Sequence, residues 1–208
     1  MPKIVTVDPA AVDEAALRDA VDALSHGLVV AFPTDTTYGL AVDPRNPAAV
    51  RRLYDLKGRG STSALALVAA DLTQAERGAV FEAAERKLAG RWWPGPLTVI
   101  APARPAIARE VLAGGDTVGV RVPDHAVARA LARAFGFCIT ATSANRSGGE
   151  PANDAAEVLA ALAGVDCVID GGATRGGAPS TIVDARHDPP RLVRQGAIPW
   201  ERVLKSLE

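Results

Sequence analysis

The stretch LVVAFPTDTTYGL, residues 28–40, joins an apolar run to a segment that is crowded with hydroxyl groups. LVVAF (28–32) has the length and the β-branched content of a buried strand. PTDTTYGL (33–40) then brings three threonines, an aspartate and a tyrosine together. A strand end that faces solvent needs only a turn. This concentration of polar groups therefore indicates a loop that binds a polar ligand.

Helix-like and strand-like segments alternate along the rest of the chain. Apolar spacing and capping residues predict helices over 13–26, 46–56 (with Asn46 as the cap), 74–90, 125–135, 154–163 (with Asn153 as the cap) and 199–207. Apolar runs predict further strands over 64–69, 97–101, 117–122, 137–141, 165–170, 180–185 and 191–194. Because the last strands follow one another without long helices between them, we expect an α/β (α+β-like) fold with a twisted mixed β-sheet flanked by helices.

Composition narrows the class of protein. The 208 residues fit one domain, expected to cover 1–208, and the formal net charge of −1 argues against a general nucleic-acid binder. Cys138 and Cys167 lie in apolar runs without the spacing of metal ligands, so we expect buried, reduced thiols. The start of the chain has no signal-peptide core and no run approaches a membrane span, which predicts a cytoplasmic protein.

Several common catalytic signatures are missing from the sequence. It contains no GxxxxGK[ST], GxGxxG, HExxH or GxSxG pattern. The three histidines are scattered, and no nucleophile is paired with a base at a recognisable spacing. Covalent catalysis by a side chain is therefore disfavoured, and the positioning of reactants is the expected mode of catalysis.

Short segments with a shared composition recur at the ends of the predicted elements. They are PTDTTYGL (33–40), KGRG (57–60), TSANRSGG (142–149), PSTIVD (179–184) and RQG (194–196). Each combines hydroxyl groups or cations with Gly or Pro, and loops at strand ends are where α/β proteins bind ligands. Cations, hydroxyls and backbone N–H groups suit phosphates and carboxylates. Each segment alone also fits an ordinary turn or helix end, whereas the ordered set is specific.

This ordered set, together with TVGVRVP (117–123), resembles the YrdC/Sua5 family of threonylcarbamoyl-AMP synthases over about residues 14–196. The resemblance implies one YrdC-like domain of the short form, with 197–208 as a C-terminal tail or helix. It implies that L-threonine, bicarbonate or CO2, and ATP give threonylcarbamoyl-AMP and pyrophosphate, for the threonylcarbamoyladenosine (t6A) modification of tRNA position 37. Mg²⁺ would enter with ATP, with no metal ligand and no covalent nucleophile from the protein.

The resemblance also assigns roles to individual residues. The implied ATP-binding residues are Lys57, Arg59, Ser63, Thr117, Ser143, Asn145 and Arg194. The implied L-threonine-binding residues are Thr34, Thr36, Arg121, Ala141 and Ser180. Tyr38 and Leu40 would pack beneath the loop instead of touching ligand. The chain departs from the usual family pattern at Gly60, Ala64 and Val68.

The family resemblance also predicts the partners of the protein. The resemblance implies a transient hand-over of the product to the tRNA threonylcarbamoyl transferase complex, with weak or no direct tRNA binding and no membrane association. Two other hypotheses stay open at this point. One is an RNA-binding or ribosome-assembly protein, which the local arginines permit but the near-neutral charge and scarce aromatic residues disfavour. The other is a nucleotide-binding module of the same fold without catalysis.

Overall fold

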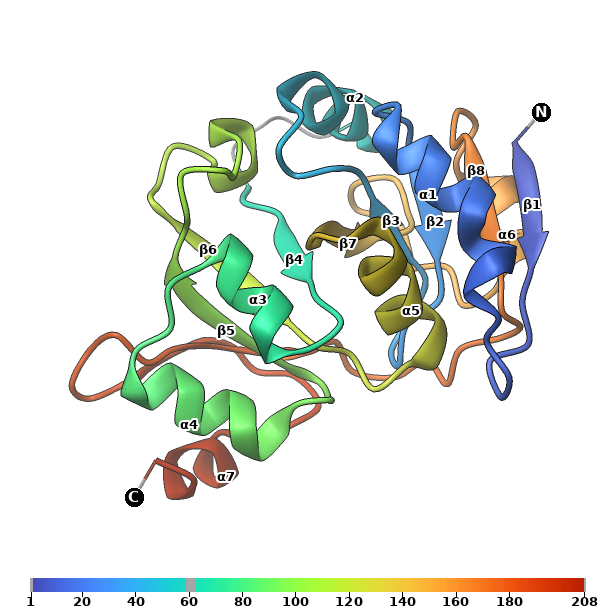
Figure 1. Ribbon diagram of the computed structural model, residues 1–208. Helices are drawn as coiled ribbons and strands as arrows, with labels where there is room; N and C mark the ends of the chain where they lie inside the picture. The colour runs from blue at the N-terminus through green and yellow to red at the C-terminus, as the bar shows by residue number, and fades with distance from the viewer. Residues whose placement is uncertain (1, 59–62, 208) are drawn as a thin grey trace.

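One mixed sheet organises the protein. Within residues 2–58 and 63–207, which the computed structural model describes, ten strands lie in the order β1-β8-β2-β3-β7-β4-β6-β5-β9-β10 (Figure 1). Their bounds are β1 Lys3–Thr6, β2 Val30–Phe32, β3 Gly39–Ala41, β4 Ala66–Val68, β5 Leu97–Pro102, β6 Thr117–Arg121, β7 Ile139–Ser143, β8 Cys167–Asp170, β9 Thr181–Asp184 and β10 Arg191–Arg194. The neighbours β2 and β3 run antiparallel, whereas β4 and β6 run parallel. The predicted mixed sheet flanked by helices is therefore confirmed.

Helices flank the sheet. They are η1 Glu14–Leu17, α1 Arg18–Ser25, α2 Pro47–Lys57, α3 Leu72–Gly78, α4 Ala83–Trp92, η2 Arg109–Leu112, α5 Ala126–Phe135, α6 Ala155–Ala161 and α7 Trp200–Lys205. Asn46 caps α2 as predicted, because its side chain accepts hydrogen bonds from the first backbone N–H groups of the helix. Figure 1 shows α1 and α5 lying side by side on one face of the sheet, where α1 contacts β2 and β8 and α5 contacts β4.

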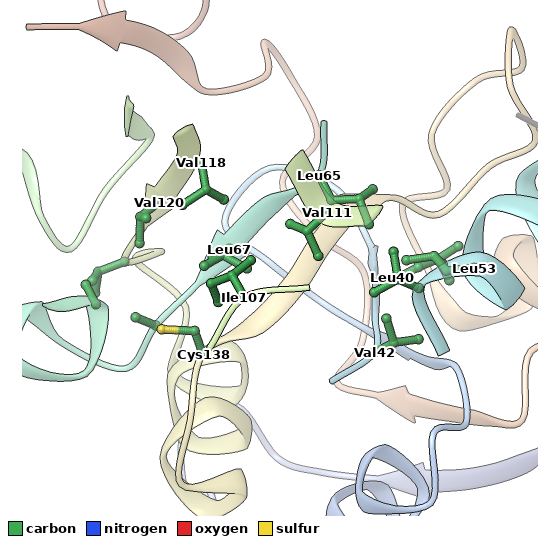
Figure 2. Packing of buried hydrophobic residues seen from close by; sticks show 14 of the residues in the cluster. Leu40, Val42, Leu53, Leu65, Leu67, Ile107, Val111, Val118, Val120 and Cys138 are labelled. Carbon is green, nitrogen blue, oxygen red and sulfur yellow. The ribbon is translucent and has the colours of Figure 1, made fainter. Parts of the chain in front are cut away.

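The two faces of the sheet belong to two apolar clusters. Leu67 of β4 and Val118 and Val120 of β6 point into the larger cluster with Leu40 of β3 (Figure 2). The smaller cluster contains the alternate residues of the same sheet, such as Phe32, together with α1 and α5. Because side chains alternate along a strand, neighbouring residues such as Leu67 and Val68 enter different clusters.

Two predicted helices differ from those observed. The segment 74–90 is not one helix: Ala79 is extended and pairs with Ala103, and Val80 donates a backbone hydrogen bond to Pro102, so α3 ends and α4 begins after a break. A new N-terminus is favourable at this point because Glu82 and Glu85 form a capping box. At the start of α6 the cap is Asp154, whose carboxylate accepts from the Glu157 N–H at 2.8 Å; the prediction of Asn153 was wrong.

The segment PTDTTYGL is only partly a loop. Residues 33–38 connect β2 to β3, but Gly39 and Leu40 already belong to β3 and pair with Phe32 and Ala31. The prediction missed this strand because the hydroxyl-rich composition masks its short apolar end. The result is a hairpin whose tip carries Thr34, Asp35 and Thr36.

Candidate active site

The register of the sheet places half of the predicted residues on one face. Ala141 pairs with Ala66, Val68 pairs with Arg121, and Val99 and Ile100 pair with Val120 and Gly119. Paired residues point to the same side of a sheet, as do residues two apart on one strand. The same face therefore carries the following residues, which we call the site face: Ser143, Ala141, Ala66, Thr117, Gly119, Arg121, Thr98, Ser180 and Arg194.

The middle of the site face is formed by residues with little or no side chain. Ala66, Gly119 and Ala141 lie on three adjacent strands, and all three are partly exposed although these strands are internal to the sheet. A Cβ at position 119 would lie 2.9 Å from the Thr98 methyl carbon, so glycine permits the close approach of that side chain. The face thus offers a shallow floor that a ligand can cover.

Lys57, Ser143 and Asn145 meet at one end of this floor. Lys57 is the last residue of α2, and its ammonium donates to the backbone carbonyls of Ser143 at 2.5 Å and Asn145 at 2.9 Å. The Ser143 hydroxyl donates to the Asn145 side-chain oxygen, and the Asn145 amide donates to the carbonyls of Arg146 and Gly149. These contacts bring Lys57 of the predicted KGRG segment together with Ser143 and Asn145 of the TSANRSGG segment, and they place a buried positive charge beside the loop after β7.

The hairpin tip meets the end of β6 through an ion pair. Arg121 donates to Asp35 at 2.5 Å, and their side chains are only 10% and 13% exposed. Thr34 fixes the tip, because its hydroxyl donates to the Thr37 carbonyl at 2.7 Å and accepts from the Thr36 N–H at 3.2 Å. The structure thus brings the predicted residues Thr34, Thr36 and Arg121 together around an aspartate that the sequence interpretation left without a role.

A third cluster lies across β5, β9 and β10. The hydroxyls of Ser180 and Thr98 are 2.8 Å apart, and the Arg194 guanidinium donates to the Ser180 hydroxyl at 3.1 Å and to its carbonyl at 2.8 Å. Although Arg194 stays exposed to solvent, loss of hydration and the positive charge of Arg121 lower the pKa of its guanidinium. The two arginines therefore act on the same region, which favours an anionic ligand there.

Tyr38 connects the loops that surround the site face. It is fully buried, as is Leu40, so both lie beneath the loop as expected. The Tyr38 hydroxyl donates to the Gly172 carbonyl at 2.8 Å, and its backbone N–H donates to Ala152 at 2.9 Å. Burial raises the pKa of this hydroxyl to about 12, so it stays a neutral donor. One side chain thus joins the hairpin to the loops that follow β7 and β8.

The remaining predicted residues lie farther apart or outside the described chain. Thr117 begins β6 and Arg121 ends it, so about 13 Å of strand separates them. Ser63 precedes β4, and its carbonyl lies 2.8 Å from the Tyr54 hydroxyl. Arg59 and Gly60 lie outside the described residues. Thr117 and Ser63 therefore extend the candidate ATP-binding region away from the Arg121 cluster.

Three residues near the site were not found by sequence reasoning. Asp35 was inside the quoted motif, but only its contact with Arg121 singles it out. Thr98 looks like an ordinary strand residue until its contact with Ser180 is known. His125 begins α5 close enough to Asp35 to respond to its charge; burial lowers the pKa of the imidazole, while Asp35 opposes that shift. Such long-range contacts leave no local pattern in the sequence.

A surface cavity lies away from the predicted residues. A cavity of about 490 Å³ is lined by α4 and the loop after β9, including Lys87 and His187, and contains none of the predicted residues. Among the residues whose positions are described, no group of three or more His, Cys, Asp or Glu side chains could bind a metal ion. No helix in residues 2–58 and 63–207 is long and apolar enough to cross a bilayer.

Comparisons with known proteins point to one family. A family model described as "Telomere recombination" and named for Sua5, YciO and YrdC matches residues 22–196. The threonylcarbamoyl-AMP synthase of Pyrococcus abyssi is 39% identical over 199 residues, which are 94% of this chain and 58% of that protein. The threonylcarbamoyl-AMP synthase of Chromohalobacter salexigens is 41% identical over 170 residues, covering 81% of this chain and 91% of that protein.

The fold agrees as well. The crystal structure of P. abyssi Sua5 complexed with L-threonine superposes with a TM-score of 0.91 at 38% identity, covering 98% of this chain and 60% of that one. This chain therefore spans less than two thirds of the length of the P. abyssi protein. The extent of the family match and the shared fold lead to one conclusion: the chain belongs to the Sua5/YciO/YrdC family.

Proposed function

We propose that this protein is a threonylcarbamoyl-AMP synthase, which converts L-threonine, bicarbonate or CO2, and ATP into threonylcarbamoyl-AMP and pyrophosphate for the t6A modification of tRNA. The main observation in support is that two separate cationic groups border the site face: Lys57 of α2 beside Ser143 at one end, and Arg121 with Arg194 at the other. A reaction that joins a polyphosphate to an amino acid needs two anion sites of this kind. The names of the relatives point to the same activity.

The proposed chemistry needs no protein nucleophile. The threonine ammonium first loses a proton to solvent, and the free amine captures CO2 to form a carbamate with release of a second proton. A carbamate oxygen then attacks the α-phosphorus of ATP, and pyrophosphate leaves with the bonding electrons of the broken P–O bond. Mg²⁺ bound to ATP would reduce the negative charge of the phosphates. The protein contributes alignment of the carbamate with the phosphate and protection from water. A floor of Ala66, Gly119 and Ala141 suits this role because it offers contact area without reactive groups.

The residues divide between the two substrates. We assign the amino-acid carboxylate to Arg121 and the amino-acid hydroxyl to the hairpin tip with Thr34 and Thr36, because these groups adjoin each other. We assign the phosphates of ATP to the region of Lys57, Ser143 and Asn145, where the structure places a positive charge beside a Ser- and Gly-rich loop. Because Arg194 and Ser180 lie at the Arg121 end of the site face, we assign Ser180 to the amino acid and Arg194 to the part of ATP that reaches the amino acid. Hand-over to a tRNA transferase complex, with little direct tRNA binding, remains part of the proposal.

The test is pyrophosphate release from ATP with Mg²⁺ and bicarbonate, measured with L-threonine, with L-serine and without an amino acid. We expect threonine-dependent release that Arg59→Ala and Lys57→Ala reduce strongly. Lys87→Ala is the matched control, because Lys87 is exposed and donates to the Leu207 carbonyl far from the site face. Thermal unfolding of each variant separates loss of function from loss of fold, since Lys57 also supports the loop after β7.

Two results would redirect the assignment. ATP binding without release, whatever amino acid is present, would contradict the synthase and favour a non-catalytic nucleotide-binding module. Tight tRNA binding with a steep dependence on salt concentration would favour an RNA-binding protein, because such a slope reports phosphate contacts.

A further inference from the structure

We assign the Arg121 guanidinium to the substrate carboxylate, but part of its hydrogen-bonding capacity is already taken up by an ion pair with Asp35. Arg121 is buried, its Nε donates to the Gly95 carbonyl at 3.0 Å, and its Nη2 donates to Asp35 Oδ1 at 2.5 Å. Within the described part of the chain, neither the other terminal nitrogen, Nη1, nor the other carboxylate oxygen, Oδ2, forms a hydrogen bond. A donor and an acceptor are therefore available on two side chains that already contact each other.

This arrangement matches one chemical class of ligand. An α-amino acid is a zwitterion in which a single carbon separates the carboxylate from the ammonium group. A carboxylate on Arg121 Nη1 would bring the ammonium next to the Arg121–Asp35 contact. Nearby Asp35 Oδ2 is then the acceptor that the ammonium needs, and charge-assisted hydrogen bonds of this kind are the stronger ones.

We propose that Asp35 accepts the ammonium group of the substrate and thereby makes the site selective for α-amino acids over hydroxy acids and simple carboxylic acids. This inference rests on the proposed function, in which the site face binds an amino acid beside Arg121. It assigns a positioning and specificity role to a residue of the hairpin tip. It assigns no proton transfer to Asp35.

The charges around Arg121 favour a substrate that binds Asp35 over a substrate that displaces Asp35 from Arg121. A substrate carboxylate that removed Asp35 from Arg121 would leave a largely buried aspartate without its partner, which is costly. When the ammonium binds Asp35, every charge keeps a partner of opposite sign. Arg194, whose positive charge acts on Arg121, adds attraction for the substrate carboxylate, so Asp35 need not leave.

The experiment compares two ligands on two proteins by calorimetric titration. The ligands are L-threonine and 2,3-dihydroxybutanoate of the matching configuration, which has a hydroxyl in place of the amine. The wild-type protein should bind threonine at least about tenfold more tightly, since a hydrogen bond to a charged group contributes on that scale. Asp35→Asn keeps the size and the oxygen that faces Arg121 but replaces the other oxygen with a donor. It should bring the affinity ratio close to one.

Controls separate this role from a purely structural one. Asp43→Asn breaks another Asp–Arg pair, the exposed contact with Arg45, and should leave the ratio unchanged. Asp35→Glu keeps the charge and should preserve part of the preference for threonine. A structural role alone would lower the affinities of both ligands equally in Asp35→Asn, and that outcome would overturn the inference.

The failure of the inference and that of the proposed function give different results. If the wild-type protein binds threonine and releases pyrophosphate but does not prefer threonine over the hydroxy acid, the role of Asp35 is wrong and the synthase stands. If the wild-type protein binds threonine selectively through Asp35 but releases no pyrophosphate, the synthase fails and the amino-acid site stands. Should Asp35→Asn not fold, the wild-type ratio and Asp35→Glu still decide.

Discussion

Helices cover one half of a sheet face, whereas the other half of the same face stays partly exposed. In one half, the face carries Phe32 of β2, Val68 of β4 and Ile139 of β7, which are buried in the smaller cluster with residues of α1 and α5. In the other half, the same face carries Ala141 of β7, Ala66 of β4 and Gly119 of β6 and stays partly exposed. Side-chain size makes the difference, because large apolar residues gain free energy from a covering helix, whereas alanine and glycine offer little to bury. The small side chains of the uncovered half thus leave that part of the face open to a ligand.

Arg121→Met should have the largest effect, because it damages the uncovered half in two ways. It leaves Asp35 largely buried without a cation, which should cost about 3–5 kcal/mol in the free energy of unfolding. It also removes the proposed carboxylate donor, so threonine-dependent pyrophosphate release should fall more than about 100-fold. Urea unfolding and the release assay measure the two effects. Wild-type activity at saturating threonine would contradict the role of Arg121.

Leu131→Ala should damage only the covered half. Leu131 is a fully buried residue of α5, and truncation should lower the free energy of unfolding by about 2–5 kcal/mol. Activity per folded molecule, measured below the unfolding transition, should stay within about twofold of the wild type because Leu131 lies inside the apolar cluster and not on the exposed floor. A large loss of activity in the folded variant would show that the two halves are coupled.

Ala141→Leu should have the reverse pattern. The added atoms extend over the exposed floor, so the free energy of unfolding should change by no more than about 0.5 kcal/mol. The same atoms would occupy ligand space and should weaken threonine binding about tenfold or more, as titration would show. Ala141→Ser is the size-matched control and should bind nearly normally. Strong destabilisation by leucine would mean that the floor is already covered.

The smallest effect should come from Asp184, a charged residue at the far end of the site face. The Arg186 guanidinium lowers the pKa of this carboxyl below its ordinary value near 3.8. Because the folded-state pKa is the lower one, the stabilisation is present above the unfolded value and is lost as pH falls through the folded value. Asp184→Asn should therefore cost at most about 1 kcal/mol at pH 7, with a smaller difference at pH 3. A difference that grows on acidification would contradict this assignment.

Sequence reasoning was most successful where local patterns decide structure. The cap at Asn46, the strand over 117–122 and the alternation of helices and strands required only short-range information. It failed where a tertiary contact overrides local propensity: Ala79 leaves the predicted helix because it pairs with Ala103. The residue types of the site were predictable, but their grouping was not, since Asp35 and Arg121 are 86 positions apart and meet only through the order of the strands.

The edge position of β10 has a consequence for how the site is assembled in time. Among the described residues this strand pairs only with β9, its four residues are exposed, and it carries Arg194. Local opening of an edge ladder needs far less free energy than global unfolding, so the end of the site that carries Arg194 should be the last to order and the first to fray. Bound nucleotide would then stabilise the pairing of β10 with β9. Amide hydrogen exchange in β10 should therefore slow on ATP binding, while exchange in β2 stays unchanged. Hydrogen exchange in this edge strand would thus report whether the site is occupied.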